Sequence, residues 1–307
     1  MTREVSLQIN LAPSDAPYVG KVLPHQLRAW GGQVSEIVLA LDLHRSRGAQ
    51  FGSRSEQQLD EIRTILARAC DRHPHARVAE VDYGGRARAD VAERFFGGRP
   101  VPLKDFRGGP YYSYFHGLAS CAGDVVLHCD ADMMFGGLSQ TWLSEAIGYL
   151  ERPEVLFVNP FPGPPAGDGE LVESARYAPV TLAPGVLSFN YVSTRVFLVD
   201  LRRLAERICP LVPERMPGLR MRLGALRARR TTHDLPENVL TRAMARAGMQ
   251  RIDVLGTPPG MWAIHPVVRD ARYYEHLSSL VRRVERGAVT PEQLGRYNLH
   301  ESMLVRD

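Results

Sequence analysis

Two aspartates one residue apart stand at the end of an apolar segment. The segment DVVLHCD covers residues 124–130, and Asp132 follows Asp130 after a single alanine. In open α/β sheets, ligands bind at the carboxyl ends of the strands. Two carboxylates at such a strand end can both reach one divalent cation and leave coordination positions for diphosphate oxygens. We therefore expect Asp130 and Asp132 to hold Mg²⁺ or Mn²⁺.

The elements that must position this pair alternate between strands and helices in the first half of the chain. Strand patterns cover 5–11, 36–42, 76–83 and 124–130, and helical spacing covers 17–30, 55–70 and 111–121. Such an alternation is typical of β-α-β units that build a mostly parallel sheet flanked by helices. The stretch 84–110 is rich in Gly, Arg and Pro, and we expect a long loop there.

The second half shows a less regular pattern. We expect strands at 156–161, around 186–199 and at 251–255, helices at 201–208 and 236–248, and a helical tail beyond Arg269. Residues 210–230 contain three prolines and a run of arginines, and we expect a mobile connection there. The expected fold class is therefore α/β with a helical C-terminal tail.

The composition excludes several classes of protein. Among 307 residues, 38 basic side chains stand dispersed against 34 acidic ones, so nucleic acid is not indicated as a partner. The four cysteines show no C-x-x-C spacing, which argues against structural zinc and a disulfide framework.

We find no apolar run for a membrane span and no apolar core of a secretory signal. We expect a soluble cytoplasmic protein, and the excess of arginine over lysine indicates a GC-rich, bacterial-looking source.

The order of these elements resembles that of the GT-A glycosyltransferases, especially the family-2-like enzymes, over residues 4–265. Asp42 in EIVLALDLHRS stands where this family has V-D-D-G-S, and the resemblance implies that Asp42 contacts the nucleotide base. The segment RGGPYYSYFHGLASCAGD resembles the family's G-x-x-x-A-R-N-x-G helix. The resemblance therefore implies that Arg107 lines the nucleotide-sugar pocket, together with the residues up to Pro110.

A later acidic segment, THDLPENVLTRAMARAGMQRIDVLG, is similar to the family's E-D-x-x-L-x-x-R-x-x-x-x-G segment. In inverting enzymes this acidic pair supplies the base that takes the proton of the acceptor hydroxyl. Asn238 stands where the acting aspartate is expected, and an amide is no base. Glu237 or Asp234 must then act, or the enzyme retains configuration and needs no such base. The alternative role is local, since Asp234 would cap the helix and Glu237 would favour its dipole.

His265, in GTPPGMWAIHPVV, follows a short apolar run. Several metal-dependent GT-A enzymes bring a late histidine to the cation, and neutral imidazole is a good ligand for Mn²⁺. The resemblance therefore implies that His265 joins Asp132 on the metal. The alternative is a hydrogen-bonded histidine of the core.

The resemblance implies a metal-dependent glycosyltransferase that moves a sugar from a nucleotide-diphosphate sugar to a hydroxyl- or amine-bearing small acceptor. The resemblance further implies that the nucleotide of the donor is UDP, GDP or dTDP. We expect a nucleotide-sugar half over 1–135, an acceptor half of the same domain over 136–268, and a helical extension over 269–307. A homodimer is compatible with the sequence.

Two alternatives remain at this stage. A nucleotidyltransferase of related fold would also use a parallel sheet and acidic metal ligands, but the chain lacks a Gly-rich phosphate loop after its first strand. A non-catalytic nucleotide- or partner-binding protein could keep the fold and use the arginine-rich residues 217–230 for docking. The same residues could instead bind diphosphate, an acidic acceptor or an anionic membrane surface, or form a lid over the bound nucleotide. The alternative without a function is a solvated amphipathic helix or a mobile loop.

Overall fold

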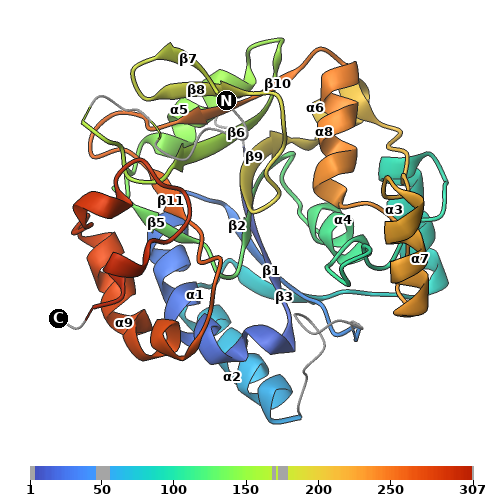
Figure 1. Ribbon diagram of the computed structural model, residues 1–307, viewed down its shortest axis with the longest axis horizontal. Helices are drawn as coiled ribbons and strands as arrows, with labels where there is room; N and C mark the ends of the chain where they lie inside the picture. The colour runs from blue at the N-terminus through green and yellow to red at the C-terminus, as the bar shows by residue number, and fades with distance from the viewer. Residues whose placement is uncertain (1–3, 46–55, 168–170, 172–178, 306–307) are drawn as a thin grey trace.

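A mixed β-sheet runs through the centre of the protein (Figure 1). The computed structural model describes residues 4–45, 56–167, 171 and 179–305. The strand order is β3-β2-β1-β4-β9-β6-β10-β8-β7, with β11 and β5 attached beside β6. These strands are β1 (Val5–Leu11), β2 (Glu36–Leu41), β3 (Ala76–Glu80), β4 (Val125–Asp130), β5 (Met134–Gly136), β6 (Val155–Pro162), β7 (Val180–Ala183), β8 (Val186–Phe189), β9 (Val196–Asp200), β10 (Gln250–Val254) and β11 (Trp262–Ile264).

The four strands from β3 to β4 are parallel, as the alternating pattern predicts. The strand β9 then runs antiparallel to both β4 and β6, and β8 runs antiparallel to β10. Strands from both expected halves thus share one sheet. The prediction of an α/β fold with a mostly parallel sheet is confirmed, and the antiparallel strands are a feature that the sequence pattern did not reveal.

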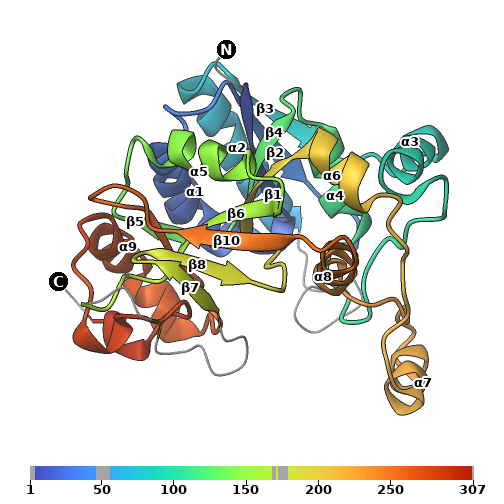
Figure 2. The same cartoon turned by 90° about the horizontal axis from the view of Figure 1, so that it is seen from above.

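Helices cover both faces of the sheet (Figure 2). One face carries α1 (Ala16–Trp30), α2 (Glu56–Arg72), α5 (Trp142–Leu150) and α9 (Ala271–Glu285); the other carries α3 (Gly85–Phe96), α4 (Tyr112–Ala119), α6 (Leu201–Ile208) and α8 (Pro236–Arg246). Alternation within a strand supplies both cores, because successive side chains point to opposite faces. In β4, Leu127 packs in the first core and Val126 in the second. No helix in these described ranges is long and apolar enough to cross a membrane.

Two expectations about loops are wrong. The stretch 84–110 contains α3, because Val91, Phe95 and Phe96 lie at helical spacing and are buried, and Gly97 ends the helix in a left-handed conformation. The stretch 210–230 contains α7 (Leu219–Arg227). Glycine and proline lie mainly at the ends of α3 and before α7, and arginines stand among the apolar residues of both helices, which is why the composition suggested loops.

The C-terminal segment is part of the core rather than an appendage. The predicted helix is α9, and its Tyr273, Leu277 and Val284 are buried against the rest of the chain. Its Glu285 accepts hydrogen bonds from the buried His25 and from Arg28 of α1, and these contacts lower the pKa of Glu285 to about 2. The short 3-10 helices Pro291–Gln293 and Glu301–Met303 follow α9. This anchoring holds the segment next to the carboxyl edge of the sheet.

Candidate functional site

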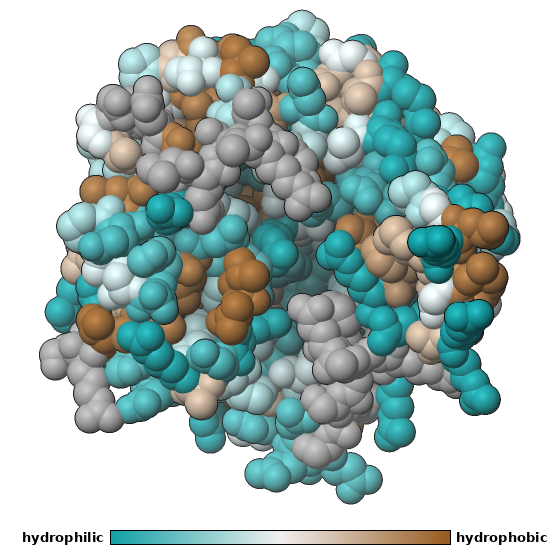
Figure 3. Space-filling model, viewed as in Figure 1, coloured by the Kyte–Doolittle hydropathy of each residue, from teal (hydrophilic) through white to brown (hydrophobic). Residues whose placement is uncertain are grey.

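The sheet brings the carboxyl ends of β1, β2 and β4 to one edge. The strand β1 lies between the other two, with Leu11 opposite Leu41 and Asn10 opposite Asp130. The N–H of Asp42 donates to the carbonyl of Leu11 at 2.8 Å. Asp42 and Asp130 therefore flank the end of the same strand, as the β-α-β pattern predicts. Figure 3 shows a hydrophilic hollow in the middle of this face of the molecule.

The two aspartates of the Asp-Ala-Asp segment have different surroundings. The Asp130 side chain is 33% exposed, whereas that of Asp132 is 9% exposed. Oδ2 of Asp132 accepts a hydrogen bond from Arg269 at 2.8 Å, while Oδ1 is buried and has no hydrogen-bond partner among the described residues. Burial, and then the charge of Asp130, raise the pKa of Asp132 to about 7 despite Arg269 and Arg195.

His265 lies beside Asp132. Its Nε2 is 3.7 Å from Oδ2 of Asp132 and accepts a hydrogen bond from the Arg195 guanidinium. Burial, and then the charge of Arg195, lower the pKa of His265 to about 3. The imidazole is therefore neutral at physiological pH, which is the form that binds a metal ion.

The residues present fit a divalent cation at the two aspartates. Asp132 has an oxygen that lacks a partner and a charge that burial makes costly, and Asp130 adds a second, accessible carboxylate. In the part of the chain described here, no three His, Cys, Asp or Glu side chains are already grouped to hold a metal. His265 meets Arg195 through the nitrogen that a metal would need. It could become a ligand only by giving up that hydrogen bond.

Asp42 belongs to a separate polar cluster at the same edge. It accepts hydrogen bonds from Lys104 Nζ at 2.6 Å, from the Tyr83 hydroxyl at 2.8 Å and from the N–H of His44 at 2.8 Å. Burial acts to raise the pKa of Asp42, but Lys104 and the other donors outweigh it and leave the pKa below its ordinary value. The rings of His44 and Tyr83 lie 4.7 Å apart. An ionised carboxylate beside aromatic rings is suited to a nucleobase, which donates hydrogen bonds and stacks.

Arg107 stands at the exposed tip of a tight turn. Asp105 forms that turn by accepting hydrogen bonds from the N–H groups of Arg107 and Gly109, at 2.7 and 2.9 Å. A Cβ on Gly109 would lie 2.6 Å from Oδ2 of Asp105, so a larger residue at this position would displace the Asp105 carboxylate. Phe106 ties the turn to the segment before α8 by donating to the carbonyl of His233 at 2.9 Å. The guanidinium of Arg107 lies over the Phe106 ring.

Asp234 is committed to the structure around α8. It is 2% exposed, and its carboxylate accepts hydrogen bonds from Asn238 at 2.8 Å and from Arg242 at 3.0 Å, besides the N–H of Leu235. Asp234 does not cap the helix as the sequence allowed, because the N-cap residue of α8 is Leu235 and no side chain caps this end; Asp234 instead holds the segment before α8 to Asn238 and Arg242. Glu237, the second residue of α8, is directed elsewhere.

Glu237 lines a cavity of about 420 Å³. The hydroxyl of Thr194 lies 3.5 Å from Oε2 of Glu237, and the backbone N–H of Thr194 also donates to this carboxylate. Burial raises the pKa of Glu237 above its ordinary value, and the charge of Arg195 opposes this. The other lining residues come from β6, β8, β9, β10 and the C-terminal segment, among them Asn159, Tyr191, Arg251, Asp253, Tyr297 and Asn298.

A buried ion pair that lies against two aromatic rings forms part of the wall of this cavity. The buried Arg251 donates to both oxygens of Asp253, at 2.6 and 2.9 Å, and its guanidinium lies 4.1 Å from the ring centre of Phe189 and 4.4 Å from that of Tyr191. Arg195 joins this cavity to the aspartate pair, because it lines the cavity and also donates to His265. The carboxylate pair and the Glu237 cavity are therefore neighbouring parts of one site.

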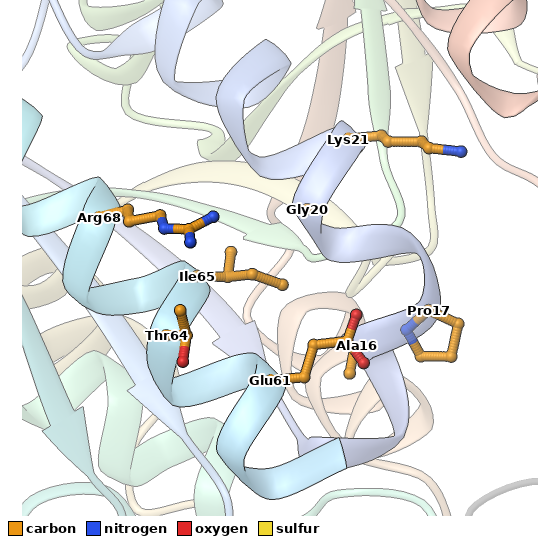
Figure 4. Close-up of a pocket in the computed structure, with 8 residues that line it drawn as sticks. All are labelled: Ala16, Pro17, Gly20, Lys21, Glu61, Thr64, Ile65 and Arg68. Carbon is orange, nitrogen blue, oxygen red and sulfur yellow. The ribbon is translucent and has the colours of Figure 1, made fainter. Parts of the chain in front are cut away.

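A second cavity, of about 480 Å³, lies apart from this chemistry between α1 and α2 (Figure 4). Ile65 points toward Gly20 across the groove, and the charged side chains at its margins are Lys21, Glu61 and Arg68. The groove is open to solvent and contains none of the residues described above. We assign no role to it.

Several residues of this site were not predicted from the sequence. Arg195, Arg269 and the pair Arg251–Asp253 come from segments without a recognisable motif. A signal existed for Lys104, one of only two lysines in a chain of many arginines. Another existed for Arg251 and Asp253, because residues two apart in a strand share a face. No signal in the sequence marks Arg195 or Arg269 among so many arginines.

No protein-family model matches the chain, and no curated protein matches it. Among solved structures, it is similar to a mannosyltransferase from Pyrobaculum calidifontis in complex with GDP-Man and Mn²⁺, with 13% identity over 94% of this chain and 66% of that one, and a TM-score of 0.45. For glucosyl-3-phosphoglycerate synthase from Mycobacterium tuberculosis in complex with Mn²⁺, UDP and phosphoglyceric acid, the identity is 14% over 92% of this chain and 77% of that one, with a TM-score of 0.38.

A mycobacterial protein is similar at 14% identity over 92% of this chain and 73% of that one, with a TM-score of 0.41. At such identities and TM-scores these likenesses carry no argument about function, which rests on the residues of this protein.

The raised pKa of Asp132 predicts a dependence of stability on pH. Between the ordinary value of 3.8 and about 7, the folded protein binds more protons at Asp132 than the unfolded chain. The free energy of unfolding therefore falls as the pH rises through this window, and levels off above it. The fall is on the order of a few kcal/mol, because one pKa unit is worth about 1.4 kcal/mol.

Urea unfolding of wild type and Asp132→Asn from pH 4 to pH 8, without added metal, measures this effect. The stability of the variant relative to wild type is expected to improve as the pH rises to about 7 and then to stay constant. The exposed Asp60→Asn is the matched control and should run parallel to wild type. Parallel curves for Asp132→Asn and wild type would show that Asp132 has no raised pKa.

Proposed function

We propose that the protein is a metal-dependent glycosyltransferase that moves a sugar from a nucleotide-diphosphate sugar to the hydroxyl or amine of a small acceptor. The observation that carries the proposal is the buried Asp132, one oxygen of which has no hydrogen-bond partner in the described part of the chain, and which lies beside Asp130 at a strand end. A cavity with a carboxylate of raised pKa adjoins this pair. The resemblance of the sequence to GT-A enzymes supports the same reaction.

The donor half of the proposed site comprises the edge formed by β1, β2 and β4. Asp42, held ionised by Lys104, accepts hydrogen bonds from the nucleotide base, and Tyr83 offers a ring beside it. Asp130 and Asp132 hold Mg²⁺ or Mn²⁺, with His265 as a further ligand once Arg195 releases it. When bound, the cation offsets the negative charge that develops on the departing diphosphate.

Arg195 and Arg269 place positive charge next to Asp132. Each lowers the pKa of Asp132, so each guanidinium favours negative charge at the place where the diphosphate would bind. We infer that either arginine turns to a phosphate oxygen when Asp132 is occupied, since guanidinium groups bind phosphate in a bidentate manner. Arg107, exposed on its turn, is a further candidate for the donor.

The acceptor half is the cavity that contains Glu237. Its volume of about 420 Å³ is in the range of small-molecule pockets and suits a monosaccharide or a metabolite of similar size. The raised pKa of Glu237 favours its action as the base that removes the acceptor proton. Asp234 is a poorer choice, because Asn238 and Arg242 already occupy its carboxylate.

Nucleotide binding tests the donor site. Calorimetry with UDP, GDP and dTDP is expected to show tight binding of one nucleotide that requires Mn²⁺. Asp132→Ala should abolish the metal-dependent part, whereas Asp124→Ala, at the opposite end of β4 and exposed, should leave it unchanged. No binding of any nucleotide under any metal condition would refute the glycosyltransferase proposal. Turnover of a nucleoside triphosphate, without release of sugar from the nucleotide sugar, would instead indicate a nucleotidyltransferase.

Glu237→Gln tests the acceptor base. The assay uses a sugar donor that contains the nucleotide identified by calorimetry, and an acceptor that supports turnover. The kcat of the variant is expected to fall by about 10²- to 10⁴-fold, which is typical of the loss of a general base. Nucleotide affinity should not change, since Glu237 lies in the other half of the site. Asp234→Asn is the control and is expected to lower stability more than kcat. Full activity of Glu237→Gln would remove Glu237 from the mechanism and favour transfer with retention.

A further inference from the structure

Helix α7 exposes an apolar face. Leu219, Leu223 and Leu226 follow one another at spacings of four and three residues, so they share one side of the helix. Their exposed fractions are 71%, 46% and 58%. A helix of a globular protein normally turns such a stripe toward the core. The face defined by these three leucines is called the leucine face below.

The contacts of α7 hold this face outward. Ala225 is its buried residue, and Arg222 donates from Nε to the carbonyl of Met216 at 2.8 Å. At about 100° per residue, Ala225 lies on a different side of the helix from the three leucines, and Arg222 lies between Ala225 and the leucine face. Figure 2 shows α7 projecting beyond the rest of the fold, and brown side chains lie over it at the right of Figure 3.

Positive charge surrounds the leucine face. Residues 215–233 contain six arginines and neither aspartate nor glutamate. The arginines are Arg215, Arg220, Arg222, Arg227, Arg229 and Arg230. Long guanidinium side chains beside exposed leucines are typical of helices that lie in the interface of a bilayer, where the leucines enter the acyl boundary and the cations meet anionic head groups.

We propose that α7 docks the protein on an anionic lipid bilayer, with the leucine face inserted and the surrounding arginines on the lipid phosphates. The charge complementarity identifies the anionic surface, and the leucines favour lipid over nucleic acid, whose backbone offers nothing apolar to them. Docking does not depend on the proposed reaction. It would, however, direct one side of the fold to the membrane: α7 projects on the side toward which β1 runs, where the carboxyl edge lies (Figure 2).

Sedimentation with vesicles tests this proposal on the full chain. Wild type is expected to sediment with vesicles of phosphatidylcholine and phosphatidylglycerol in equal parts, and to remain in solution with phosphatidylcholine alone. Binding should weaken as salt is added, because the ions screen the arginines. Equal binding to both kinds of vesicle, or none to either, would overturn the proposal.

Two sets of variants locate the contact. The triple change Leu219→Ser, Leu223→Ser and Leu226→Ser should reduce the vesicle partition coefficient at least about tenfold. The double change Arg220→Gln and Arg227→Gln should reduce it by a similar factor. The matched control is Val180→Ser with Leu182→Ser, which removes two exposed apolar side chains of β7 and should leave binding unchanged. All variants should keep the melting temperature of wild type, since none of these side chains is buried.

Full vesicle binding by the triple variant would overturn the role of the leucine face. Sedimentation velocity without lipid tests the remaining alternative, in which a second copy of the chain covers the leucine face. A dimer of wild type that the triple variant loses, together with no binding to vesicles, would make α7 an interface between copies of the chain and would refute membrane docking.

Discussion

The arrangement of the site depends on one electrostatic constraint, the burial of Asp132 beside Asp130. A carboxylate that is taken out of water next to a second carboxylate is costly unless a positive charge compensates it. In this protein the compensation comes from Arg269 and Arg195, which approach from distant parts of the chain. One oxygen of Asp132 nevertheless has no hydrogen-bond partner among the described residues. The two arginines thus offset part of the cost of burial, and the unpaired oxygen is the one that we propose for the cation.

This constraint explains why the C-terminal segment is built into the fold. Arg269 lies two residues before α9, whose buried face and whose Glu285 contact with His25 anchor it on α1. His265 is tied to the same segment, since its N–H donates to the carbonyl of Tyr297 and its carbonyl accepts from the N–H of Leu299. Gly295, Tyr297 and Asn298 in turn line the Glu237 cavity. A segment that looks like an extension in the sequence thus supplies one wall of both parts of the site.

The sequence predicted those parts of the structure in which local pattern and global fold agree. The strand Val5–Leu11 and the helix Leu201–Ile208 have the predicted bounds, because each alternates apolar and polar residues at the period of its own element. The position of Asp42, Asp130 and Asp132 at one edge follows from the parallel order of the strands.

The helix α3 was missed because its apolar residues stand among glycines and arginines. The antiparallel strand β9 between β4 and β6 could not be read, since pairing depends on contacts between distant segments. Arg195 and Arg269 were missed for the same reason. Glu237 and Asp234 were both proposed as the base from the sequence, and their roles differ in the structure because the carboxylate of Asp234 is already bound by Arg242.

The central claim is that Asp130 and Asp132 form a site that exchanges an arginine for a divalent cation. Electron paramagnetic resonance of Mn²⁺ added to the protein with the preferred nucleoside diphosphate measures this most directly. We expect a bound-metal signal that grows as the pH rises through about 7, where Asp132 loses its proton, and that disappears in Asp132→Asn but not in Asp60→Asn. A spectrum of free Mn²⁺ with wild type at pH 8, or an unchanged bound signal in Asp132→Asn, would contradict the account.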